Sequence, residues 1–139
     1  MNDTGDMFLF PLNLLLFSVC GVHFGVDADQ VAGIAAYNGE ESDDLFWFHE
    51  ELNYGAAGGP YFSPTVITIR IIDGQSYRVI IDSMEDITGF SQNEISLFPA
   101  LLEPFAAQRG LWGILPRNGS MVFLLDFQRL FAEKRQVND

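Results

Sequence analysis

Lysine and arginine are absent from the first 69 residues of this 139-residue chain, and the whole chain contains only seven of them. The same 69 residues carry ten of the 19 acidic residues, and the formal net charge is −12. Such a surface repels the phosphates of nucleic acids and of anionic lipids. We therefore expect no nucleic-acid partner. Two alternatives stay open: the acidic half attracts a basic protein surface, or it keeps an apolar protein in solution.

Cysteine occurs once, as Cys20, so no disulfide can form within the chain. A single thiol fits a reducing compartment, and we expect a cytoplasmic protein. The chain also lacks a long unbroken apolar run. Residues 7–26 are nearly free of charge, but Pro11, Gly21 and Gly25 interrupt them and the preceding residues are acidic. This pattern predicts a hairpin of two strands, and neither a signal peptide nor membrane insertion.

Motifs for catalysis or metal binding are scarce. Residues 49–51 read His-Glu-Glu, but position 53 is asparagine, so the HExxH motif is incomplete. The other histidine is His23, and zinc requires three or four ligands at close spacing. Cys20 and His23 flank an expected tight turn, where they would point to different faces. We predict no metal site and no enzyme; a ligand-binding or enzymatic barrel built on these few residues is the weakest hypothesis.

What the chain does contain is a strand–turn–strand pattern that occurs twice in its second half. The first copy joins residues 65–72 to 77–82 through Asp-Gly, and the second joins 111–115 to 120–126 through Asn-Gly. These dipeptides accept the positive φ that tight hairpin turns need. Apolar and polar residues alternate along 65–72, so we expect Ile69 to lie on a buried face.

The remaining segments predict short strands and single helical turns. Serine and glutamate at positions 91 and 94 form a capping-box pattern, which predicts a helical turn there. The full set of expected elements comprises strands at 12–19, 22–26, 32–37 and 45–48, helical turns at 27–31, 49–53 and from Ser91, a loop over 96–110, and a last helix from Phe127 capped by Asp126.

Many short strands separated by turns predict a mainly β protein made of two small barrels packed together. Glycine and proline cluster in residues 55–64, which reads as a linker between the two halves. We therefore predict one domain over residues 8–133, with a first barrel at about 8–57, the linker at 55–64, a second barrel at 65–126 and a short C-terminal helix at 127–134.

The order and spacing of these elements resemble the CheW-like domain family. That family includes the adaptor of bacterial chemosensory arrays and the regulatory domain of its histidine kinase, CheA. Residues 78–95 and 111–131 are similar to the second half of that domain, and residues 17–34 and 47–55 are more loosely similar to its first half. The resemblance covers about residues 14–133 and depends on the order of the elements, not on one motif.

The resemblance implies two intertwined five-stranded, SH3-like barrels, with the first barrel complete or one strand short, and no cofactor. It implies a non-catalytic adaptor that docks the regulatory domain of a CheA-type histidine kinase, the cytoplasmic tip of a chemoreceptor, or both. Val31 and Ile34 match the segment where family members contact receptor or kinase. We add Phe46, Trp47 and Phe48 as expected contacts, because three neighbouring aromatic residues on a strand cannot all face one side.

One departure from the family supports a second hypothesis. Between the third strand and residues 45–48 the family carries a longer stretch with an Asn-Leu-Arg-Gly type of motif, and here only the polar residues 38–44 stand in its place. A chain without that motif could instead be a self-associating structural module, a homo-oligomer that does not couple to receptors. In either case a partner would cover an unpaired strand edge.

Overall fold

The computed structural model describes residues 12–52, 61–72 and 75–132. Over these residues the chain is mainly β, as the sequence predicts, and its helices are short. The elements in chain order are β1 (Leu12–Val19), β2 (Val22–Asp27), η1 (Ala28–Gln30), β3 (Val31–Ala36), β4 (Leu45–Trp47), α2 (Phe48–Glu51), β5 (Thr65–Ile72), β6 (Gln75–Ile81), β7 (Ser83–Phe90), η2 (Gln92–Glu94), α3 (Glu103–Gln108), β8 (Leu111–Arg117), β9 (Ser120–Leu125) and α4 (Phe127–Leu130).

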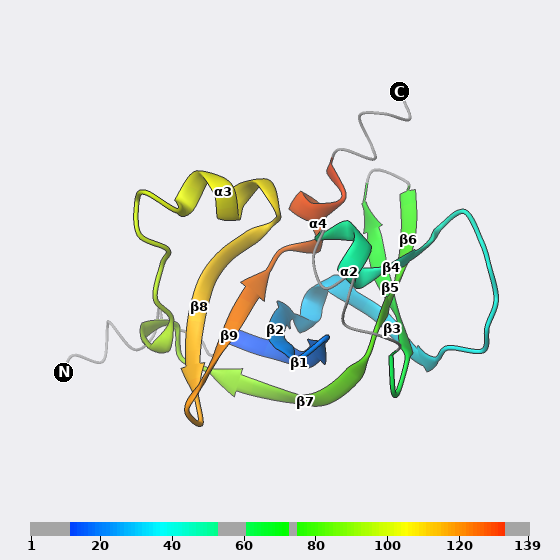
Figure 1. Ribbon diagram of the computed structural model, residues 1–139, viewed down its shortest axis with the longest axis horizontal. Coiled ribbons are helices and arrows are strands. Elements are labelled where there is room, and N and C mark those ends of the chain that lie inside the picture. Colours follow the sequence, from blue (N-terminus) through cyan, green and yellow to red (C-terminus); the bar gives the residue numbers. More distant parts are fainter. Residues whose placement is uncertain (1–11, 53–60, 73–74, 133–139) are drawn as a thin grey trace.

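The strands form two sheets, and each sheet contains strands from both halves of the chain (Figure 1). One sheet has five strands in the order β7-β1-β2-β9-β8, and the other has four in the order β3-β5-β6-β4. Strands from the first half of the chain pair with strands from the second half in both sheets, for example β1 with β7 and β3 with β5. Each sheet thus combines strands from both sides of the predicted linker, and the barrel ranges of 8–57 and 65–126 stay a prediction.

Strand β1 is buried on both faces, which explains its nearly continuous apolar sequence. Leu15 and Phe17 belong to the larger core cluster, which also contains Ile69 and other residues of the four-stranded sheet. Leu14 and Leu16 point the opposite way, into a smaller cluster with residues of β8 and β9. A run that resembles a membrane segment thus contains an interior strand of the five-stranded sheet, with core on each side. No helix in the described residues is long and apolar enough to cross a membrane.

Two hairpin turns have the conformation that their sequences predict. Cys20 and Gly21 have φ of 54° and 82°, and Asn118 and Gly119 have φ of 52° and 80°. Positive φ at both central residues matches the right-handed twist of the flanking strands. The Asp-Gly turn expected at residues 73–74 lies outside the described residues, as do most of the expected linker and residues 133–134 of the expected last helix.

The segment between the two hairpins differs from expectation in two places. Strand β7, which the sequence did not suggest, pairs with β1 along an exposed edge where acidic residues such as Asp86 face solvent. Helix α3 lies within the expected loop 96–110, with Pro104 in its first turn, where proline is tolerated. The helical turn η2 does carry the predicted capping box of Ser91 and Glu94.

Strands β6 and β7 follow each other almost without interruption, so the chain passes directly from the smaller sheet into the larger one (Figure 1). Asp82 is the residue between them, and its side chain is only 8% exposed. Its Oδ1 accepts hydrogen bonds from the backbone N–H groups of Phe62, at 2.8 Å, and Ser63, at 2.7 Å. This carboxylate therefore fixes the start of the segment that leads into β5.

Candidate functional site

Strand β3 forms one edge of the four-stranded sheet and, within the described residues, pairs with β5 alone. Most of its residues are exposed and small, and Ile34 is 40% exposed. We call this strand the β3 edge. An uncharged edge with free backbone groups is a common docking surface for another protein.

Local contacts hold the β3 edge in place. Asp27 caps η1 by accepting from the N–H of Asp29 at 2.9 Å. Gln30, at the end of η1, donates from Nε2 to Asp126 Oδ1 at 2.9 Å and accepts at Oε1 from the N–H of Phe127 at 2.8 Å. Arg70 donates from Nε to the carbonyl oxygen of Asp29 at 2.6 Å. The start of the β3 edge is thereby tied to the first turn of α4 and to β5.

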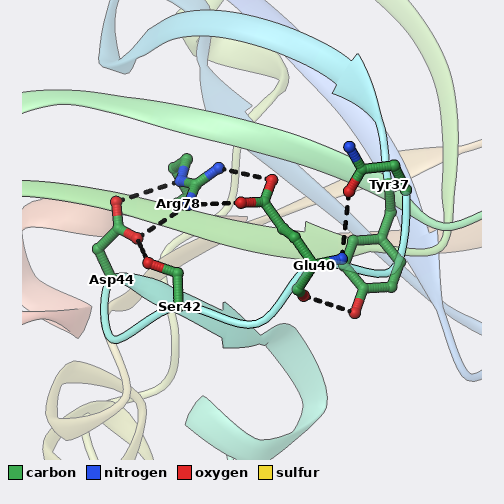
Figure 2. Close-up of polar contacts among 6 residues, drawn as sticks. Tyr37, Glu40, Ser42, Asp44 and Arg78 are labelled. Atoms are coloured by element: carbon green, nitrogen blue, oxygen red, sulfur yellow. Dashed lines mark hydrogen bonds and ion pairs between the residues drawn. The ribbon is translucent and has the colours of Figure 1, made fainter.

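Residues 37–44, which we call the acidic loop, follow β3 and are bound by one guanidinium (Figure 2). Arg78 of β6 donates to Glu40 from Nη1 and Nη2, at 3.0 and 3.3 Å. It also donates to Asp44 from Nε and Nη2, at 3.1 and 2.9 Å. The N–H of Arg78 donates to the carbonyl oxygen of Asp44 at 2.8 Å, so the loop is held to β6 through backbone and side chain together.

The charges in this cluster stabilise one another. The hydrogen bonds from Arg78, followed by that from Ser42 Oγ at 2.6 Å, lower the pKa of Asp44 below its ordinary value of 3.8. The same carboxylates raise the pKa of Arg78. Within the loop, the hydroxyl of Tyr37 donates to the carbonyl oxygen of Glu40 at 2.9 Å, and Asn38 Oδ1 accepts from the N–H of Glu40 at 3.1 Å. The acidic loop therefore has a defined conformation built by its own side chains.

An aromatic cluster lies beside the acidic loop. The ring of Trp47 meets Tyr37 and Tyr61 edge to face, with ring centroids 5.4 and 5.0 Å apart. The hydroxyl of Tyr61 accepts from the N–H of His49 at 3.2 Å and lies 2.9 Å from Nδ1 of the same residue. Burial raises the pKa of the Tyr61 hydroxyl, so it stays protonated and can donate to Nδ1.

A cavity of about 300 Å³ opens between the acidic loop and strand β4. Its walls come from the loop, from the aromatic cluster and from β6. The lining residues are Tyr37, Glu40, Glu41, Ser42, Leu45, Trp47 and Ile80.

The five residues predicted to contact a partner lie in different environments. Ile34 is exposed, whereas Val31, Phe46 and Trp47 are half-buried. Val31 and Phe46 pack against the larger core cluster. Phe48 is fully buried in α2, with its ring centroid 5.1 Å from that of Phe17. The expectation that Phe48 offers contact surface is thus corrected, because its side chain belongs to the core.

The residues that suggested catalysis lie on different elements, with Cys20 at the turn between β1 and β2, His23 on β2 and His49 in α2. His23 Nδ1 lies 3.1 Å from Glu85 on β7. Cys20 packs against the larger core cluster at the turn. Across residues 12–52, 61–72 and 75–132 there is no group of three His, Cys, Asp or Glu side chains that could hold a metal ion.

Sequence reasoning missed two features of the surface. The ion pairs of Arg78 join residues more than thirty positions apart, and no local pattern indicates them. The sequence predictions also did not include an apolar patch between η2 and β8. The apolar run Leu-Phe-Pro-Ala-Leu-Leu at 97–102, within an expected loop, indicates this patch. Its exposed members are Leu97, Leu101, Leu102 and Phe105, at 75%, 82%, 51% and 62% exposure.

No protein-family model matches the chain, and no curated protein matches it in sequence. Among solved structures, the chain is similar to the scaffolding protein TtCheW from Thermoanaerobacter tengcongensis, with a TM-score of 0.66 and 16% sequence identity. The match covers 88% of this chain and 93% of that protein. At this identity the similarity concerns the fold. The chain therefore has the CheW-like fold that its order of elements suggests.

Proposed function

We propose that this protein is a non-catalytic adaptor of a bacterial chemosensory complex, and that it docks the regulatory domain of a CheA-type histidine kinase. The observation that carries the proposal is the β3 edge, an exposed and uncharged strand in a CheW-like fold. Docking at a strand edge extends a sheet into a partner, so backbone hydrogen bonds supply affinity and side chains such as Ile34 supply selectivity.

Three further residues are proposed to support the docking surface. Val31 lies at the start of β3, and Phe46 and Trp47 form β4 on the opposite edge of the same sheet. All three side chains are half-buried. Val31 is proposed to support Ile34 within the β3 edge, whereas Phe46 and Trp47 are proposed to add a second contact at β4. The cytoplasmic tip of a chemoreceptor is a second proposed partner for the same sheet, in a cytoplasmic complex.

Binding to a purified CheA-type regulatory domain from the same organism tests the proposal. Replacing Ile34 with lysine places a charge on the β3 edge, and we expect the dissociation constant to rise by about tenfold or more. Met121→Lys is the matched control, since Met121 is 54% exposed on β9 in the other sheet. Absence of binding at low salt, or equal losses in the two variants, would reject docking through β3.

The 97–105 patch favours a second candidate function, self-association. Monomeric proteins seldom expose several large apolar side chains close together. Each copy carries a formal charge of −12, so repulsion opposes assembly at low salt and screening favours it. Sedimentation velocity at low and high salt would detect this, with Leu101→Gln as the test and Met121→Gln as the control. A monomer under both conditions would remove the candidate.

A further inference from the structure

The cavity beside the acidic loop combines two features that attract positive charge. Tyr37 and Trp47 both line it, with their ring planes at 73° and their centroids 5.4 Å apart. Aromatic faces attract ammonium and guanidinium groups, and Trp is the most effective of them. The ring of Tyr61 also packs edge to face against Trp47, which restricts the position of the indole.

The second feature is an excess of carboxylates. The acidic loop holds Glu40, Glu41, Asp43 and Asp44, and Arg78 is bonded to two of them, so the group retains a formal charge of −3. Glu41 lines the cavity, and within the described residues it has no cationic partner. A carboxylate on the wall of an aromatic cavity offers a charge partner for a cation held against the rings.

The walls of the cavity are held in place without a ligand. Glu40 is bonded through its carboxylate, its N–H and its carbonyl oxygen, and Ser42 is bonded to Asp44. A cation would therefore enter a preformed site and would lose little free energy in ordering the loop. Among the described residues, no three His, Cys, Asp or Glu side chains are placed to hold a metal ion, so the cavity is not a metal site. The negative charge of the acidic loop disfavours anions.

We propose that this cavity binds an organic cation, an ammonium or guanidinium group, against the wall formed by Tyr37 and Trp47 and beside Glu41. The group has two possible sources: a free small molecule, or a lysine or arginine side chain of a partner protein. The proposal shares Trp47 with the proposed kinase contacts but does not depend on docking through the β3 edge, because the acidic loop and β4 form the cavity.

Nuclear magnetic resonance provides a direct reporter. The chain has only two tryptophans, Trp47 in the cavity and Trp112 in the smaller core cluster, so two indole N–H signals are expected and Trp112→Phe assigns them. The probes are choline, arginine amide with its α-amino group acetylated, and a short acetylated peptide with one arginine. Their neutral counterparts are 3,3-dimethylbutan-1-ol, citrulline amide acetylated in the same way, and the same peptide with citrulline. We expect a saturable shift of the Trp47 signal with the charged probes and an unmoved Trp112 signal.

Variants then separate charge from shape. Glu41→Gln keeps the size of the side chain and removes its charge, and we expect the dissociation constant of the cation to rise about three- to tenfold. Glu103→Gln makes the same change on α3, outside the cavity, and should leave the constant unchanged. Both side chains lie at the surface, and unchanged circular dichroism would show that each variant folds.

The results decide both the site and the source. Saturation with choline or arginine amide supports a small-molecule site, and saturation with the arginine peptide alone supports recognition of a partner side chain. Equal shifts with the neutral counterparts would overturn the proposal, and so would no shift up to about 10 mM of any charged probe, which would saturate a 1 mM site. An equal loss in Glu41→Gln and Glu103→Gln would also overturn it. Kinase binding is measured separately, so either proposal can fail alone.

Discussion

Replacing Asp82 tests how the passage between the two sheets is held together. One oxygen of its carboxylate, Oδ1, accepts both backbone N–H groups of residues 62 and 63. Hydrogen bonds to a charged acceptor contribute about 1.5–3 kcal/mol in proteins. Because the two donors belong to exposed residues, water can replace part of the loss in Asp82→Ala. We therefore expect this variant to lower the free energy of unfolding by about 2 kcal/mol.

Asp82→Asn is the matched comparison, because an amide oxygen can accept the same two hydrogen bonds without the charge. We expect it to lose about half as much free energy as Asp82→Ala. Urea denaturation followed by circular dichroism gives both values, and the slope of the transition should stay constant if only the folded contacts change. A loss below about 0.5 kcal/mol in Asp82→Ala, or equal losses in both variants, would refute the assigned role of this carboxylate.

Two other predictions concern the core and the acidic loop. Ile69→Ala should lower the free energy of unfolding by about 2–5 kcal/mol, because Ile69 is 1% exposed. The control Ile34→Ala, at 40% exposure, should lower it by less than about 1 kcal/mol. Urea denaturation of both variants checks which face of each strand is buried. Arg78→Gln should cost about 0.5–1 kcal/mol at pH 7, a value reduced by the solvent exposure of its partners. The pKa of Asp44 is lowered in the folded state, so this contribution is present above pH 3.8 and disappears as the pH falls through the folded pKa. A stability difference between wild type and Arg78→Gln that persists in strong acid would contradict the ion pair.

Local patterns were sufficient to predict the hairpins and most of the helical turns. The positive φ at Asn118 follows from the Asn-Gly dipeptide, whereas at Cys20 the sequence predicts only a turn. Asp126 caps the last helix, as expected for an aspartate that directly precedes an apolar helical pattern. The polar strand β7 was not predictable in this way. Its sequence, SMEDITGF, lacks the alternation of a half-buried strand, and it is ordered by pairing with β1.

The candidate site was only partly predictable for the same physical reason. The CheW-like resemblance led to Ile34, which the fold exposes, whereas the aromatic run at 46–48 led to Phe48, which the core encloses. The ion pairs of Arg78 with Glu40 and Asp44 depend on where β6 lies relative to the acidic loop. Interactions over such a separation need the pairing of β4 with β6, and that parallel pairing is invisible in the sequence of either strand.

The pairing of β2 with β9 has a consequence for biosynthesis. Synthesis begins at the amino terminus, so β1 and β2 leave the ribosome long before β9, the last strand within residues 75–132. Until then two of the most apolar strands lack the neighbours that cover them, and contacts of such long sequence separation form slowly. We therefore expect the newly made chain to be most prone to aggregation before β9 has been synthesised.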